Sequence, residues 1–439
     1  MSADTRDVRS LDTPPSPTNL SPQPAGIGEA LHALRPHATL FALLCIATFF
    51  EGFDTKLASF VQPVIREDFA ASVEAVGYAL GVSSFGMVLA FFVNLQADVV
   101  GRRPVFLGAL AVYALFTLAT AFAQDLATFT ALQFVARGAM VVELFLAYQI
   151  LSEEVAPAIR GRVNGLLAST ATLGAAVPAV LLAPLDSMGF GWRGLFLVGA
   201  LPLVLLPIYF RRIPETRAFA DRLNTGTRYG EDFKRIARTL WRSEDRGRLI
   251  RVSVIWVAVN FWSGSAMYFF FLYSSEERGW TAADLQWLPL GTIPLGVALY
   301  VLAGVAMDRF GRRRAASLYL VACFVMTTIC YRATDDRLIY LAYCAMFGLN
   351  GIWTIVTTWT LELFATESRA TALAIANNLV GRMGLVFGPM AGGALSAAWG
   401  SAGAAIPALA GVTLVVLPLI WTLPETNGID LQEVDPARA

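Results

Sequence analysis

Long apolar runs constrain the fold of this chain more than any other feature of its sequence. Breaks at charged, proline or glycine residues divide the chain into twelve such runs. Several of them reach the roughly 20 residues that a helix needs to cross about 30 Å of hydrocarbon. Charged residues make up only 15% of the 439 residues, whereas soluble domains average roughly a quarter. The sequence therefore predicts an all-α membrane protein that lies in a lipid bilayer.

The expected spans fall into two groups of six. They are residues 38–63, 75–97, 104–123, 126–151, 163–185 and 192–210, followed by 252–274, 284–307, 315–331, 338–361, 371–396 and 402–423. We therefore expect a six-helix bundle in residues 36–210, a linker in residues 211–251 and a second six-helix bundle in residues 252–423. The composition of residues 1–35, rich in Ser, Pro, Thr and Asp, predicts a disordered tail. Residues 424–439 form a second expected tail.

The basic residues indicate how the chain lies in the membrane. Most Arg and Lys residues between spans fall in the even-numbered connections, including the linker 211–251. Cytoplasmic loops carry the excess of basic residues, and an even number of spans places both chain ends on one side. We therefore expect a monomer in the cytoplasmic membrane with both termini in the cytoplasm.

Several other classes of protein find no support in the sequence. A net charge of zero provides no electrostatic footprint for nucleic acid. The two histidines, His32 and His37, precede the first span, and the four cysteines lie in apolar runs without metal spacing. We expect no metal, no cofactor and no nucleic-acid partner. Because the sequence contains no nucleophile–base pair, we do not expect an enzyme either.

The two halves of the chain repeat one another in sequence. Three separate motifs of the first half recur 209 or 210 residues later. The matching segments are Asp98–Arg103 with Asp308–Arg313, Glu153–Arg160 with Glu362–Arg369, and Pro214–Thr216 with Pro424–Thr426. Internal duplication underlies transporter architectures, in which the binding site lies near the midplane between the repeats.

The first of these motifs resembles the signature of the major facilitator superfamily. Each copy contains an aspartate at a helix end, a glycine that permits a tight turn and consecutive arginines; the first copy departs from the signature, with Asn94 for Gly and Val99 for a basic residue. The resemblance covers residues 38 to about 428 and implies two six-helix bundles that move a small solute by alternating access. It implies gating roles for Asp98, Gly101, Arg102, Asp308, Arg309, Gly311, Arg312, Glu153, Arg160, Glu362 and Arg369.

Segments in spans 1 and 11 indicate which branch of the superfamily the chain resembles. Glu51–Thr55 reads Glu-Gly-Phe-Asp-Thr, which resembles the Asp-Gly-Phe-Asp-Thr run of aromatic-acid/proton symporters. Gly381–Gly384 and the pair Gly388-Pro389 are similar to the same family, whereas Pro214–Thr216 and Pro424–Gly428 resemble both this branch and the sugar porters. The pair Val177-Pro178 stands where drug exporters carry Gly-Pro. The resemblance implies proton-coupled uptake of a small organic acid. A sugar or polyol symporter, an exporter and a receptor that binds without transport are the alternatives.

Three carboxylates lie inside the expected spans. A charged side chain at mid-helix costs roughly 2.5–3.5 kcal/mol on insertion scales, so each one indicates a function. Glu51 and Asp54 are three residues apart and share a helix face. We expect Asp54 to carry the coupled proton, followed by Glu51 and Glu143. A structural ion pair with Arg137 or Arg382 is the alternative.

Basic and amide side chains in the spans are the candidates for binding the solute. A planar guanidinium is the natural bidentate partner of a carboxylate, which favours Arg382 and then Arg137. Fixed pairs with Asp54 and Glu143 are the alternatives. Lys56 is a further candidate, unless it snorkels to the membrane surface. Buried amides need partners, so we add Asn260, Asn350, Asn377 and Asn378, the last of which lies four residues before Arg382.

Overall fold

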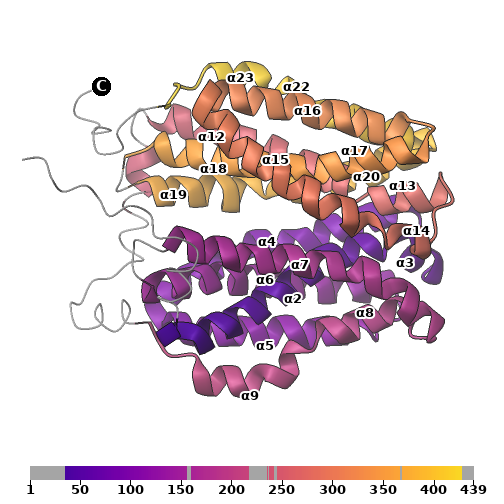
Figure 1. Ribbon diagram of the computed structural model, residues 1–439, viewed down its shortest axis with the longest axis horizontal. Helices are drawn as coiled ribbons and strands as arrows, with labels where there is room; N and C mark the ends of the chain where they lie inside the picture. Colours follow the sequence, from indigo (N-terminus) through magenta and orange to yellow (C-terminus); the bar gives the residue numbers. More distant parts are fainter. Residues whose placement is uncertain are drawn as a thin grey trace, which may run out of the picture.

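The computed structural model is a bundle of long helices that lie side by side (Figure 1). It describes residues 35–155, 160–216, 235, 237–241, 245–365 and 368–427. Within these ranges there is no strand, and twelve helical stretches are long and apolar enough to cross a membrane. The predicted all-α membrane fold is therefore confirmed. The expected N-terminal tail, apart from Arg35, lies outside the described residues, as do most of the linker and most of the C-terminal tail.

The first six spans occupy the lower half of the molecule in Figure 1. They are α2 (Ala38–Phe60), α4 (Val73–Val100), α5 (Arg102–Thr120), α6 (Leu126–Glu154), α7 (Arg160–Ser187) and the pair α8 (Gly191–Gly199) and α9 (Pro202–Arg212). The short η1 (Arg35–His37) precedes α2, and α3 (Gln62–Asp68) connects α2 to α4. Ser72 and Asp125 cap α4 and α6 by accepting hydrogen bonds from backbone N–H groups, as side chains at helix starts commonly do.

The last six spans form the upper half, and several are built from consecutive helices. They are α12 (Asp245–Trp262), η3 (Ser263–Met267) and α13 (Phe270–Glu276); α14 (Ala282–Leu285) and α15 (Leu288–Phe310); α16 (Arg312–Arg332); α17 (Asp336–Leu349) and α18 (Ile352–Glu362); α19 (Arg369–Leu373), η4 (Ala374–Gly381) and α20 (Met383–Trp399); and α21 (Ala402–Ala410), α22 (Val412–Val415) and α23 (Leu417–Trp421). Both η3 and η4 are π-helices.

The molecule has two distinct ends. We call the end with the loops 101–103 and 311–313 the arginine-rich end, and the opposite end, where α3 lies against α13, the α3–α13 end. Gly101 and Gly311 have φ values of 118° and 84°, which only glycine adopts without strain. The expected tight turns at these two positions are therefore present.

The two halves contact each other mainly through α4 and α20. Small residues allow these helices to approach closely, as is common between membrane helices. A Cβ atom at Gly77 would lie 2.6 Å from the Pro389 carbonyl oxygen, and one at Gly393 would lie 2.8 Å from the Val73 oxygen. These contacts hold the halves together in the part of α4 that starts from the α3–α13 end.

Candidate functional site

Three carboxylates of the first half lie in its interior with unused hydrogen-bonding capacity. Asp54 is 2% exposed, and its Oδ2 accepts a hydrogen bond from Thr117 at 3.4 Å while Oδ1 has no partner. Glu51, one turn earlier on α2, is 8% exposed and accepts a hydrogen bond from Thr55 at 2.9 Å. Both carboxylate oxygens of Glu143 on α6 are buried without a partner. The structure therefore presents three buried acceptor groups on α2 and α6.

Two arginines lie across the interface between the halves in a reciprocal arrangement. Arg137 of the first half has its guanidinium carbon 5.5 Å from the ring centre of Tyr268 in the second half. Arg382 of the second half lies 5.5 Å from the ring centre of Phe145 in the first half. Arg137 donates one hydrogen bond to Ser84 at 3.0 Å. Its Nε and Nη2 have no partner, nor does Nε of Arg382.

The alternative of fixed ion pairs is not realised in this conformation. Among the described residues, no carboxylate oxygen lies within 4.0 Å of a nitrogen of Arg137 or Arg382. A buried charge without a partner is costly. The site therefore has capacity for a bound carboxylate, a proton or water at the interface of the two halves.

The candidate amides divide into two groups. Asn260 donates to Asn377 at 3.5 Å, and its own Oδ1 is buried without a partner. Oδ1 of Asn378 is likewise unpartnered. Asn350 instead donates to two carbonyl groups of its own helix and accepts a hydrogen bond from Ser263 at 3.4 Å. Asn350 thus has less capacity left for a solute than the other three.

The helix that leads to Arg382 differs from the expected α-helix. Residues Ala374–Gly381 form a π-helix, and the Arg382 N–H donates to the Asn377 carbonyl, five residues earlier, at 2.9 Å. The longer turn aligns Asn377, rather than Asn378, with the turn below Arg382. Single π-turns occur frequently at functional sites, and a second one (η3) packs against α20.

Some residues of this site could not be identified from the sequence alone. Ser84 and Thr117 hold Arg137 and Asp54, and Phe145 lies under Arg382. Hydroxyl and phenyl side chains of this kind are common throughout membrane helices, so only the folded arrangement identifies these three.

At the arginine-rich end, the repeated motifs of the second half form one polar cluster. Arg312 donates to both oxygens of Glu362, at 2.7 and 2.9 Å, and Thr426 donates to the same carboxylate at 2.5 Å. Glu425 accepts the backbone N–H groups of Arg312 and Arg313 at the start of α16, where a negative charge is favoured. Burial raises the pKa of Glu425, but these backbone hydrogen bonds outweigh it and hold that pKa below its ordinary value.

The first half contains the equivalent cluster. Arg102 donates to Glu153 at 3.3 Å, and Thr216 donates to Glu153 at 2.5 Å. Glu215 accepts the backbone N–H groups of Arg102 and Arg103. The sequence repeat is thus also a structural repeat.

The remaining gating candidates at the arginine-rich end differ in their exposure and in their contacts. Asp308 has a side chain that is 77% exposed, and its ion pair, at 3.5 Å, is with Arg312 of its own half. The side chains of Asp98 and Arg160 lie outside the described residues. Arg309 lies 5.7 Å from the Phe310 ring centre, and Arg369 begins α19. Among the described side chains, Asp308 and Arg309 form no ion pair with the other half.

At the α3–α13 end, by contrast, the halves are joined directly. Arg66 of α3 forms an ion pair with Glu276 of α13. The rings of Phe60 on α2 and Phe271 on α13 also meet across the two halves, with centres 3.9 Å apart. Arg66 and Glu276 are 210 residues apart, the same shift as the repeated motifs. The two residues thus occupy equivalent positions of the two halves, and their contact was not predicted from the sequence.

Two bundles of six membrane helices, with buried charged residues near their interface and a repeated polar cluster at one end, are the arrangement expected of a membrane transporter. The chain belongs to the Major Facilitator Superfamily, whose family model matches residues 44–298 and 257–435. The resemblance stated from the sequence is thereby confirmed.

Relatives of this chain are named for the transport of niacin, cis,cis-muconate and 4-hydroxybenzoate. It is 25% identical to the "Niacin transporter NiaP" of Acinetobacter baylyi, over 81% of this chain and 86% of the relative. It is 27% identical to the "Cis,cis-muconate transport protein" of the same organism, over 80% of this chain and 85% of the relative. It is 24% identical to the "4-hydroxybenzoate transporter PcaK" of Pseudomonas aeruginosa, over 82% and 87%.

Solved structures share the fold at low identity. A bacterial homologue of the human lysosomal transporter Spinster, in an inward-facing and occupied conformation, has a TM-score of 0.73 at 14% identity, covering 88% of this chain and 96% of that one. A D-xylose–proton symporter has a TM-score of 0.70 at 15% identity, covering 90% and 99%. The chain is therefore a multi-pass membrane transporter of small solutes, and its family is one of transporters rather than enzymes.

Proposed function

We propose that this transporter carries a small organic acid, aromatic in character, into the cell together with protons. The observation that carries the proposal is the reciprocal pair Arg137 and Arg382, whose guanidinium groups lie across the interface of the halves with unused N–H donors. Relatives named for niacin, 4-hydroxybenzoate and cis,cis-muconate support the same class of solute.

The solute's carboxylate would bind between the two arginines. A carboxylate accepts two parallel hydrogen bonds from a guanidinium, and such charge-assisted bonds are among the stronger ones in proteins. Tyr268 and Phe145, which lie against the arginines, would contact the ring of the solute. Asn260 and Asn377, which face one another across α12 and η4, offer polar contacts to ring substituents.

The coupled proton would bind Asp54, with Glu51 and Glu143 as the other candidates. Asp54 has a buried oxygen without a partner, lies on the same helix as Glu51 and is near enough to Arg137 to interact with its charge. A carboxylate in such surroundings is costly as an anion unless a cation or a proton accompanies it. Protonation of Asp54 would therefore accompany any change in the occupancy of the arginine pair.

Alternating access would proceed by movement of one half against the other. We assign the arginine-rich end to the cytoplasm, because basic loops remain on that side, and the α3–α13 end to the outside. The two repeated clusters would stabilise each half as a unit while contacts between the halves form and break. This assignment places both termini in the cytoplasm and the chain in the cytoplasmic membrane.

Counterflow in proteoliposomes tests the class of solute. Vesicles loaded with unlabelled 4-hydroxybenzoate, nicotinate or xylose receive the same compound in radiolabelled form outside. We expect exchange with the acids and none with xylose. Exchange with xylose alone would replace the acid proposal by a sugar transporter. Protein that binds an acid yet exchanges nothing would be a receptor.

A further inference from the structure

We propose that a second binding site for an organic anion surrounds Lys56, apart from the arginine pair and nearer the α3–α13 end. The inference deepens the proposed function, on which it rests for the class of ligand, an aromatic monocarboxylate.

The site is a pocket between the halves. α2 and α7 of the first half and α15 and α17 of the second line it. In this conformation the enclosed part of the pocket holds little more than a water molecule, so a larger ligand would enter as the two halves move apart. The residues that matter most for the argument are Lys56, Phe60, Thr172, Thr292, Tyr343 and Phe347.

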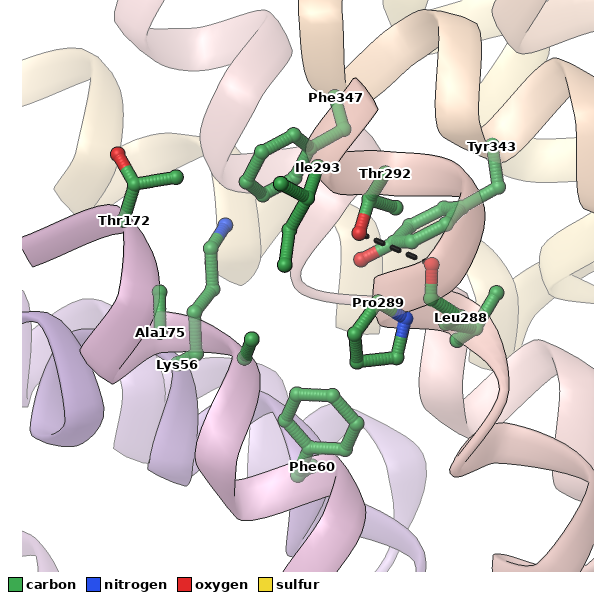
Figure 2. A pocket seen from close by; sticks show the side chains of 11 residues that line it. Lys56, Phe60, Thr172, Ala175, Leu288, Pro289, Thr292, Ile293, Tyr343 and Phe347 are labelled. Atoms are coloured by element: carbon green, nitrogen blue, oxygen red, sulfur yellow. Dashed lines mark hydrogen bonds between the residues drawn. The ribbon is translucent and has the colours of Figure 1, made fainter. Parts of the chain in front are cut away.

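Lys56 supplies a positive charge that has no counter-ion. Figure 2 shows its amino group in the space between Thr172 and Phe347. Its Nζ lies 5.2 Å from the ring centre of Phe347, and among the described residues it has neither an ion pair nor a hydrogen bond. The side chain therefore projects into the pocket instead of following the membrane surface, as snorkelling would require.

An unpaired ammonium group at this depth of a membrane helix is expensive. A carboxylate that enters the pocket would remove this cost, because it provides the missing negative charge. The rings of Phe60 and Phe347 lie within reach of the same space, so the ligand's apolar body would pack against them.

The remaining polar groups of the pocket favour an apolar anion over a sugar. Thr172 and Thr292 both donate their hydroxyl protons to carbonyl groups of their own helices. The hydroxyl of Tyr343 has no hydrogen bond among the described residues. Lys56 and Tyr343 are thus the two hydrogen-bond donors left for a ligand. Two donors are sufficient to bind one carboxylate but too few to bind the several hydroxyl groups of a polyol.

Helix geometry separates this pocket from the central charges. Successive residues of an α-helix differ by about 100°, so Lys56 points about 200° away from Asp54, nearly to the opposite face of α2. Lys56 also lies five residues beyond Glu51, or about 7.5 Å further along the helix axis. Asp54 contacts Thr117 inside the first half, whereas Lys56 contacts the second half.

Equilibrium binding of radiolabelled benzoate to the purified full-length protein tests the inference. We expect the wild type to bind two benzoates per chain. Lys56→Gln should lose the second equivalent, because removing a charged hydrogen-bond partner weakens affinity roughly 10- to 100-fold. Lys56→Arg, the matched control, should retain both, and Arg382→Gln should lose the central one alone. Neutral benzamide should bind wild type and Lys56→Gln equally.

Other results of the benzoate-binding measurement would contradict the Lys56 site, the role of Arg382 or both. If Lys56→Gln binds two benzoates with wild-type affinity, or if the wild type binds a single benzoate that Lys56→Gln leaves unchanged, the second site is overturned. If Arg382→Gln leaves both equivalents intact while Lys56→Gln removes one, the Lys56 site stands and the proposed role of Arg382 fails. A protein that binds no benzoate at all overturns both.

Discussion

Arg382 reaches its position through an irregular helix, and its free Nε is the kind of group that a buried site leaves open for a ligand. If it binds the solute's carboxylate, Arg382→Gln should weaken carboxylate binding by roughly 10- to 100-fold, because that is the range for charged hydrogen bonds. The neutral amide analogue should lose little. Isothermal titration with benzoate and benzamide measures both. Arg309→Gln, an exposed arginine far from the site, is the control, and an equal loss for the two ligands would make Arg382 a structural residue.

At the same scale, the sequence predicts the charged residues of the site but not their surroundings. Asp54, Arg137 and Arg382 are conspicuous because they interrupt apolar runs. Ser84 and Phe145, their neighbours, are of types that occur throughout such runs, so only the packing of α4 and α6 identifies them. Whether Asp54 pairs with Arg382 depends on the relative position of the two halves, which no local pattern encodes.

Among the elements, α3 and α13 close one end of the molecule, and their ion pair is a candidate latch. Exposed ion pairs contribute roughly 0.2–1 kcal/mol. Glu276→Gln should therefore raise the ratio of the conformation that is open at the α3–α13 end to the closed one by up to about fivefold. Ser59, which is buried and precedes Phe60 at the end of α2, can report on the opening of this end once it is replaced by cysteine. We expect Ser59→Cys to be alkylated faster in Glu276→Gln than in its parent. The charge swap Arg66→Glu with Glu276→Arg should restore the slow alkylation rate of the parent. Equal alkylation rates in the parent, the Glu276→Gln variant and the charge-swap variant would contradict a latch role for this ion pair.

The loop before α16 gives a second prediction for an element. Asp308 pairs with Arg312, which also holds Glu362. Asp308→Asn should slow exchange and net uptake while equilibrium binding of the solute stays nearly intact, because the residue lies at the arginine-rich end, remote from the buried charges. Asp336→Asn at the opposite end serves as the matched control. Unchanged transport rates in Asp308→Asn would contradict a gating role for this loop.

The connection between α3 and α8 bears on pH dependence. The hydrogen bond and charge of Arg193, with a further hydrogen bond from Trp192, hold the pKa of Asp68 below its ordinary value of 3.8. This carboxylate therefore stabilises the fold fully above pH 3.8 and loses that contribution as the pH falls through its lowered pKa. The melting temperatures of wild type and Asp68→Asn should differ by a constant amount from pH 8 to pH 5. A difference that vanishes near pH 6 would contradict this assignment.

Elements were predictable to different degrees. The glycines of the two repeated loops indicate tight turns, and their positive φ values bear this out. The π-helices η3 and η4 were not predictable, because one extra residue in a turn depends on the close packing of α12 against α20. There a Cβ atom at Gly384 would lie 2.3 Å from the Val257 carbonyl oxygen, so the backbones themselves set the geometry.

For the whole molecule, the duplicated sequence and the twelve apolar runs were sufficient to predict the fold. Each span must be helical because hydrocarbon offers no partner for backbone polar groups. The conformation was not predictable. Arg66 and Phe60 join the halves at the α3–α13 end in this structure. Alternating access requires that these contacts break in another conformation, whose stability relative to this one depends on the bound solute and proton.

The most direct test of the account is solute accumulation driven by a pH gradient in proteoliposomes, with Asp54→Asn beside the wild type. The wild type should concentrate 4-hydroxybenzoate when the outside is acidic, and its solute affinity should vary with pH, because proton and solute binding are linked reciprocally. Asp54→Asn mimics the protonated carboxylate, so it should exchange solute between loaded compartments, fail to concentrate it and bind it with an affinity that no longer varies with pH. An Asp54→Asn protein that still concentrates the solute against its gradient would place the coupling at another carboxylate, with Glu51 and Glu143 next. A wild type that ignores the gradient would contradict proton coupling altogether.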